Sequence, residues 1–192
     1  MCKVVFFIFS LVCVVILAPI TAFAEKSTAV EIYLTKSQLS LVDVQSPTFS
    51  HQKWTSEERT LTSKTDLSIT IKDSRTGGNS AWALYYRLDA YQEKNSRLSL
   101  EQARTHIGQG QLTSADRTVT SDEYQAYPID MEVTNQTEQC LLNHIKTNES
   151  GPITYIYTVN KDDISLQLPK GIRAGSYTAQ QIITLRDLPK SN

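Results

Sequence analysis

Apolar and polar residues alternate one by one along much of the chain. A period of two, with Val, Ile, Thr and Tyr frequent, is typical of β-strands that turn one side toward a core and the other toward water. Turn-forming residues such as Ser46-Pro47 and Pro169-Lys170-Gly171 separate the runs. The pattern predicts an all-β antiparallel sandwich with at least six strands. The clearest alternating segments are residues 30–34, 67–71, 129–133, 153–157 and 164–168.

Two segments do not follow this alternation. Residues 53–64 are polar and charged, and they are predicted to form a loop or an irregular linker. Residues 95–106 contain Leu98, Leu100 and Ala103 among charged residues, which predicts one or two helical turns inserted across the sheet edge. No internal repeat and no linker composition interrupts the chain, so a single domain is expected.

The N-terminal residues carry the pattern of a secretory signal peptide. Lys3 supplies a short basic region, residues 4–18 are almost wholly apolar, and Ala22-Phe23-Ala24 is a small-x-small cleavage signal. We therefore expect residues 1–24 to be removed, leaving residues 25–192 as a secreted domain with no membrane span. A retained membrane anchor is the alternative, but the apolar run is shorter than the roughly 20 residues that a span needs.

Charge and cysteine content narrow the range of partners. The chain has 19 Lys and Arg against 20 Asp and Glu, a net charge of −1, so nothing attracts it in general to nucleic acid or to an anionic membrane. Signal cleavage leaves Cys140 as the sole cysteine, and the fold is expected to be held by its core without a disulfide. We predict that Cys140 is a small buried strand residue rather than a reactive thiol.

The sequence offers no arrangement typical of an enzyme, a metal site or a cofactor site. His51, His106 and His144 lie in unrelated segments, outside any HExxH or paired Cys/His spacing. Asp162-Asp163 could bind calcium, but a solvated turn is the commoner outcome for such a pair. A wall-modifying hydrolase, which would need two carboxylates across a cleft, is the weakest alternative. We therefore predict no catalytic activity, no metal and no cofactor.

Two motifs carry the strongest functional signal. The first is Trp82-Ala83-Leu84, which follows a polar, glycine-bearing turn at residues 73–80. The second is the closing run at residues 174–189, which also begins with a polar, glycine-bearing turn. Together they resemble the paired signatures of the WxL family of Gram-positive surface proteins. Residues 39–50 and 164–177 also resemble the opening segment and the last hairpin of that family.

The second motif departs from the family pattern at one position. The family's distal element has a Tyr, then Leu-Thr-Trp-x-Leu, then a Pro. Tyr177, Leu185 and Pro189 fall in register with this element, whereas Ile183 stands where the second Trp is expected. The chain therefore resembles a divergent member of the family.

The resemblance implies a function at the cell surface. It implies a β-rich domain that attaches non-covalently to the Gram-positive cell wall, through peptidoglycan, and that often works beside other wall-associated surface proteins. The alternative is a non-catalytic subunit of a multi-protein surface complex, whose exposed sheet edge pairs with partner chains. Composition does not separate the two.

The candidate binding residues follow from the two motifs. Trp82 and Leu84 share one face of a predicted strand, where Trp82 is either a core anchor or a partly exposed platform for a sugar ring or a peptide. Tyr177, Ile183 and Leu185 share one side of the distal run. The resemblance implies that these five residues line an apolar groove that binds the wall.

Overall fold

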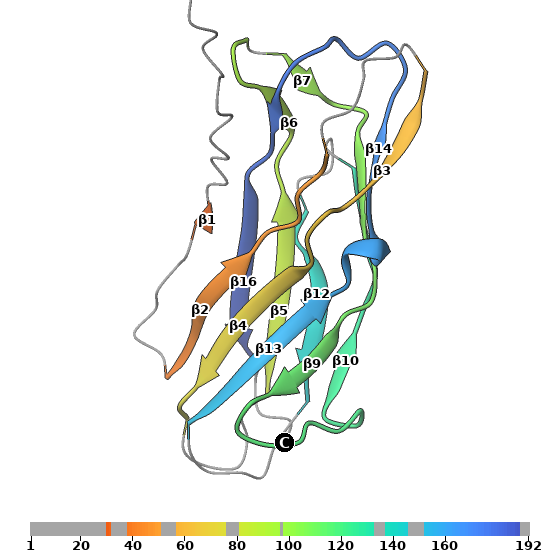
Figure 1. The fold of residues 1–192 in the computed structure, drawn as a ribbon. Coiled ribbons are helices and arrows are strands. Elements are labelled where there is room, and N and C mark those ends of the chain that lie inside the picture. Colours follow the sequence, from red (N-terminus) through yellow and green to blue (C-terminus); the bar gives the residue numbers. More distant parts are fainter. Residues whose placement is uncertain are drawn as a thin grey trace, which may run out of the picture.

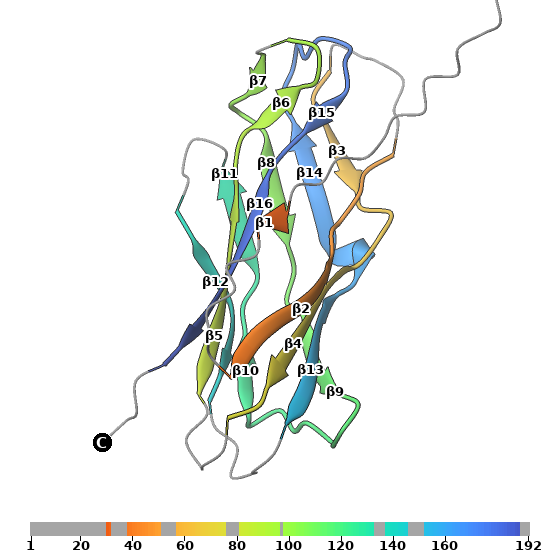
Figure 2. The same ribbon diagram turned by 90° about the vertical axis from the view of Figure 1, so that its left-hand side faces the viewer.

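The computed structural model describes residues 30–31, 38–50, 57–75, 81–96, 98–132, 137–145 and 152–188. The predicted signal peptide at residues 1–24 lies outside these residues. The described part consists almost wholly of β-strands arranged in two layers (Figures 1 and 2). Within it the one helix is the single turn η1 (Lys161–Asp163), and nothing helical has the length and apolar character needed to cross a membrane.

One layer is a five-stranded sheet. Its strands are, in spatial order, β1 (Val30–Glu31), β16 (Gln181–Asp187), β5 (Trp82–Leu88), β12 (Gln139–His144) and β10 (Tyr124–Ala126). Neighbours are antiparallel except β1 and β16, which run parallel. A small sheet of β15 (Tyr177–Thr178), β6 (Tyr91–Glu93) and β7 (Ser99–Leu100) lies beyond the end of β5 (Figure 1).

The other layer contains two four-stranded sheets that follow each other along the length of the molecule (Figure 2). The first has the order β2 (Leu39–Gln45), β4 (Leu67–Asp73), β13 (Ile153–Val159) and β9 (Gln111–Ser114). The second has the order β11 (Ile129–Glu132), β8 (Arg104–Ile107), β14 (Ile164–Leu168) and β3 (Arg59–Thr62). Consecutive strands change from one of these sheets to the other four times: from β2 to β3, from β3 to β4, from β8 to β9, and from β13 through η1 to β14.

Two glycines allow close packing where β8 bends into β9. A Cβ atom on Gly110 would lie 2.4 Å from Cζ of Tyr157, and the Gly110 N–H donates to the Tyr157 hydroxyl at 3.1 Å. A Cβ atom on Gly108 would lie 2.7 Å from the Cβ atom of Asp163 in η1. No side chain larger than hydrogen fits at either position without movement of its neighbours, so the bend requires glycine.

The interior is built from alternate strand residues. Every second residue of β4 from Leu67 to Asp73 and of β13 from Ile153 to Val159 is buried. Every second residue of β5 from Trp82 to Leu88 is buried too, and Ala83 between the first two is also buried. The predicted antiparallel sandwich is confirmed, and the 16 strands in the described part exceed the six expected.

The helical turns predicted at residues 95–106 are wrong. This segment contains β7 and most of β8, joined by a turn. Thr105 and Ile107 are buried, whereas Arg104 and His106 face solvent. The segment forms a strand because β-branched side chains at alternate positions pack well on a half-buried sheet.

The loop predicted at residues 53–64 is also wrong in its second half, because Arg59–Thr62 forms β3. Among the described strands β3 pairs with β14 alone, so it lies at a sheet edge. Only Leu61 of this strand packs against the core cluster. An edge strand needs few apolar residues, and its composition therefore resembles that of a loop. Residues 51–56 lie outside the described part.

We expect Gly110→Ala to destabilise the domain by about 1–3 kcal/mol, because the new methyl group overlaps the Tyr157 ring in a packed interior. The matched control is Gly175→Ala at an exposed position, where the new methyl group would meet Cγ of the flexible, half-buried side chain of Glu93. Urea unfolding followed by circular dichroism measures both variants. A Gly110→Ala protein as stable as the parent would show that the bend does not pack as described.

Candidate functional site

The two motif segments lie side by side in the five-stranded sheet. β5 and β16 pair in antiparallel register, with Trp82 opposite Asp187 and Leu84 opposite Leu185. Continuing along the ladder, Ile183 stands opposite Tyr86. The side chains of Trp82, Leu84 and Ile183 are at most 1% exposed, and Leu185 is half-buried.

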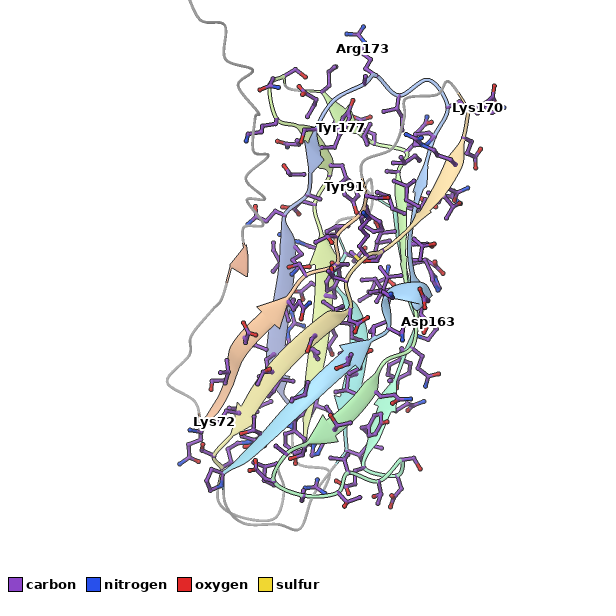
Figure 3. The ribbon with its side chains drawn as sticks, viewed as in Figure 1. Lys72, Tyr91, Asp163, Lys170, Arg173 and Tyr177 are labelled. Carbon is purple, nitrogen blue, oxygen red and sulfur yellow. The ribbon has the colours of Figure 1, made fainter. Side chains whose placement is uncertain are left out.

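Tyr177 lies apart from the other predicted site residues. It belongs to β15 and pairs with Glu93 of β6, and its hydroxyl donates to the carbonyl oxygen of Arg173 at 3.0 Å. Figure 3 shows Tyr177 at the end of the molecule opposite to Lys72. Trp82 begins β5 near the Lys72 end, so the five predicted residues do not form one continuous exposed groove in this structure. Their contact with a wall ligand stays a prediction.

Trp82 joins the two layers of the sandwich. Its ring stacks on His144 of β12, with centroids 4.9 Å apart and an interplanar angle of 7°. Tyr155 of β13, in the facing layer, meets Trp82 edge-on at 5.7 Å and His144 at 5.0 Å. All three residues are at most 1% exposed. The core-anchor interpretation of Trp82 therefore describes its position here, with its ring closed to solvent.

His144 is the partner that sequence reasoning missed. It appeared as one of three scattered histidines, and its alternation with buried Leu142 on β12 was the signal that could have placed it in the core. Register on β12 and β5 sets His144 opposite Trp82. The nearly parallel imidazole and indole rings adopt the stacked arrangement that aromatic pairs favour.

An ion pair lies beside this aromatic cluster. The guanidinium of Arg117 is 5.6 Å from the Tyr155 ring centroid, and its Nη2 donates to the Tyr155 hydroxyl at 3.2 Å. Its Nη1 donates to Oε1 of Glu123 at 2.9 Å. These hydrogen bonds stabilise the carboxylate and lower the pKa of Glu123 to about 2.

A second ionic cluster ties the ends of β4 and β16 together. Nη2 of Arg75 donates to Asp73 at 2.6 Å, and its Nη1 donates to Asp187 at 2.5 Å. Asp187 is the residue opposite Trp82. The ends of the two motif strands are thus fixed to the facing layer by charge as well as by the aromatic stack.

The residues between the buried motif positions face the opposite side of the sheet. Tyr85 on β5 and Thr184 and Arg186 on β16 point away from the core, because side chains alternate along a strand. The Arg186 guanidinium lies 4.6 Å from the Tyr85 ring centroid and forms an ion pair with Glu138. Oγ1 of Thr184 donates to Oε1 of the same carboxylate at 2.7 Å.

Cys140 lies on this outward face of β12, half-buried and opposite Tyr85. Its thiol donates to Oδ1 of Asn143 at 3.2 Å, and burial raises the pKa of the thiol. Cys140 is thus a strand residue, as predicted, but it is only partly buried.

A cavity of about 420 Å³ lies on the second four-stranded sheet, away from both motifs. Four of the polar residues around it are joined in two pairs. Nε2 of Gln167 donates to Glu58 at 2.5 Å, and Arg104 pairs with Glu132 at 2.9 Å. Across the described ranges no group of His, Cys, Asp and Glu is arranged to hold a metal ion.

Comparison with known proteins identifies the sequence family. The model of the WxL domain, described as surface cell wall-binding, matches residues 23–189. No curated protein and no solved structure matches the chain. The match covers both motifs, and it begins at residue 23, one residue before the predicted end of the signal peptide.

The register of the ladder predicts the effect of restoring the second motif Trp. Tyr86 stands opposite Ile183 on the same buried face, so its ring occupies part of the space that a Trp at position 183 would need. We expect Ile183→Trp to destabilise the domain by about 1–3 kcal/mol through overpacking.

A double-mutant cycle tests whether this overpacking comes from Tyr86. We expect Tyr86→Ala to relieve it, so that the double variant is more stable than the sum of the single effects predicts, by at least about 0.5 kcal/mol. Urea unfolding of the four proteins provides the measurement. Additive effects would show that the two residues do not share this space.

The lowered pKa of Glu123 predicts how the stability of the domain depends on pH. The pKa of this carboxylate is lowered from 4.5 to about 2 in the folded protein. Its contribution to the free energy of unfolding is therefore complete above pH 4.5 and is lost as the pH falls toward 2. We expect Glu123→Gln to lower stability by about 1–3 kcal/mol at neutral pH, and the deficit to shrink as the medium is acidified.

Asp122→Asn is the matched control, because Asp122 is the adjacent carboxylate and is exposed. Unfolding midpoints in urea, measured from neutral to acidic pH, compare the variants with the parent. A Glu123→Gln deficit that stays constant with pH would contradict the role given to this ion pair.

Proposed function

Because the chain belongs to the WxL family of surface cell wall-binding proteins, we propose that it is exported and binds the peptidoglycan of a Gram-positive wall non-covalently. Residues 1–24 serve as the signal peptide in this proposal, and residues 25–192 form a single wall-binding domain. The family match supports it by starting near the predicted cleavage site and continuing through nearly all of the remaining chain. The mechanism is adhesion without turnover.

The observation that carries the proposal is the pairing of the two motif strands in one sheet. β5 and β16 are neighbours over their whole length, from Trp82 opposite Asp187 to Leu88 opposite Gln181. Motif side chains that pack inward give this sheet a fixed shape. A fixed shape favours non-covalent binding, because the protein then loses little conformational entropy when the ligand binds.

The five predicted site residues have two roles in this proposal. Trp82, Leu84 and Ile183 support the sheet from the core, where they are closed to solvent. Tyr177 and Leu185 are half-buried, so each retains surface that a wall ligand can reach.

A second candidate function is favoured by the open edge of β16. β1 covers this strand only at Gln181 and Ile182. From Ile183 to Asp187 the outer edge has no neighbouring strand among the described residues. A strand of another surface protein can add to such an edge through backbone hydrogen bonds. The protein would then be a non-catalytic subunit of a surface complex.

Sedimentation separates the two functions. We expect the secreted protein to pellet with purified, protein-free cell wall, and to stay in solution without wall. A protein that pellets only when the wall retains its own proteins would favour the subunit function instead. N-terminal sequencing of the same preparation is expected to begin at Glu25, and retention of Met1 would contradict the signal peptide.

A further inference from the structure

The outward face of the five-stranded sheet carries charged pairs around an aromatic ring. Tyr85 lies near its middle, with Arg186 over the ring at 4.6 Å. Glu138 holds the guanidinium from the side. Farther along β5, Nε of Arg87 pairs with Asp89 at 3.5 Å. Each cation on this face therefore has its own anion, and the two pairs carry no net charge.

Some polar groups on this face are available for hydrogen bonds with a ligand. Arg186 has five N–H donors, and among the described residues it gives one of them to Glu138. Its side chain is 51% exposed, so part of it is open to solvent, and its other donors have no hydrogen-bond partner among the described residues. The Tyr85 hydroxyl has no hydrogen-bond partner in the described ranges.

The surface extends across β12. Nδ2 of Asn143 donates to the Tyr127 hydroxyl at 3.3 Å. Asn143 stands opposite Ala83, the residue between Trp82 and Leu84 of the first motif. An amide and a second phenol thus lie on the same side of the sheet as Tyr85. No described strand covers this side in Figure 2.

We propose that this outward face, centred on Tyr85, Arg186 and Asn143, binds an uncharged sugar chain of the cell wall. The assignment rests on the proposed wall-binding function and names the surface and the ligand class for it. A pyranose ring presents an apolar side to a flat platform and hydroxyl and acetamido oxygens to the free donors. A neutral chain fits because Glu138 and Asp89 cancel the positive charge that would attract a phosphate polymer.

The test compares variants in sedimentation with purified wall from which phosphate polymers have been extracted. We expect Arg186→Ala and Tyr85→Ala each to weaken binding at least about tenfold, as truncation of a central contact does. The control is Arg104→Ala, which removes an exposed guanidinium from an Arg–Glu pair on the other layer, and it should change affinity by less than about twofold. Circular dichroism and an unchanged unfolding midpoint show that Arg186→Ala is folded.

The ligand class is tested with Glu138→Gln, which frees Arg186 from its carboxylate. For a neutral sugar chain, this change should not strengthen binding, and the parent should bind about equally from about 0.05 to about 0.5 M NaCl. A soluble oligomer of N-acetylglucosamine should displace the parent from the wall. Tighter, salt-sensitive binding by Glu138→Gln, together with loss of binding on extraction of phosphate polymers, would overturn the neutral-chain assignment.

Failure of the site and failure of the function give different results. A parent protein that pellets with wall while Arg186→Ala and Tyr85→Ala pellet equally well overturns the site and leaves wall binding intact. A parent protein that does not pellet overturns wall binding, and the site with it.

Discussion

The stacked contact among Trp82, His144 and Tyr155 is the interaction on which the rest of the structure depends. It is formed by three strands from two layers, and it closes the sandwich at the end where the first motif begins. β5 is hydrogen-bonded on one side to β12 and on the other to β16. A shift of Trp82 would therefore move both of its neighbours, because a packed interior transmits displacement instead of absorbing it.

The ionic groups at this end act on the same geometry. Arg75 connects Asp73 on β4 with Asp187 on β16, which is the residue opposite Trp82. The motif end of the sheet is thus held through aromatic packing inside and through charge at the rim. Such a rim contributes more than an isolated surface pair, because Asp73 is 5% exposed and the cluster is partly shielded from water.

Alternation along the sequence was sufficient to predict the central strands and insufficient for the edges. β4 and β13 have long apolar runs of period two, and they form where expected. Only Leu61 of β3 packs against the core, and β7 is two residues long. Neither pattern is long enough to distinguish a strand from the loop predicted for β3 or the helical turns predicted for β7. Tertiary pairing, which a local pattern does not contain, determines these strands.

The candidate site shows the same limit. The two motifs indicated which strands matter, and the family resemblance correctly gave the family and the β-rich fold. The alternation also predicts that Trp82 and Tyr85 lie on opposite faces of the strand. It does not predict which of the two faces packs against the other layer. The contacts of His144 and Glu138 with the motif strands depend on tertiary structure. The register of β12 places His144 opposite Trp82, and the residues before β12 bring Glu138 to Thr184. Such contacts between distant segments have no signature in a single sequence.

The two faces of the five-stranded sheet are exposed to different kinds of selection. A substitution on the inner face changes the stability of the fold, whereas one on the outer face changes the surface that the protein presents to other molecules. Ile183, in the place of an aromatic residue, lies on the inner face beside Tyr86. A change at this position therefore alters the packing against Tyr86 and leaves the outward-facing side chains in place. The family signature on the inner face and the side chains on the outer face are therefore separable by substitution.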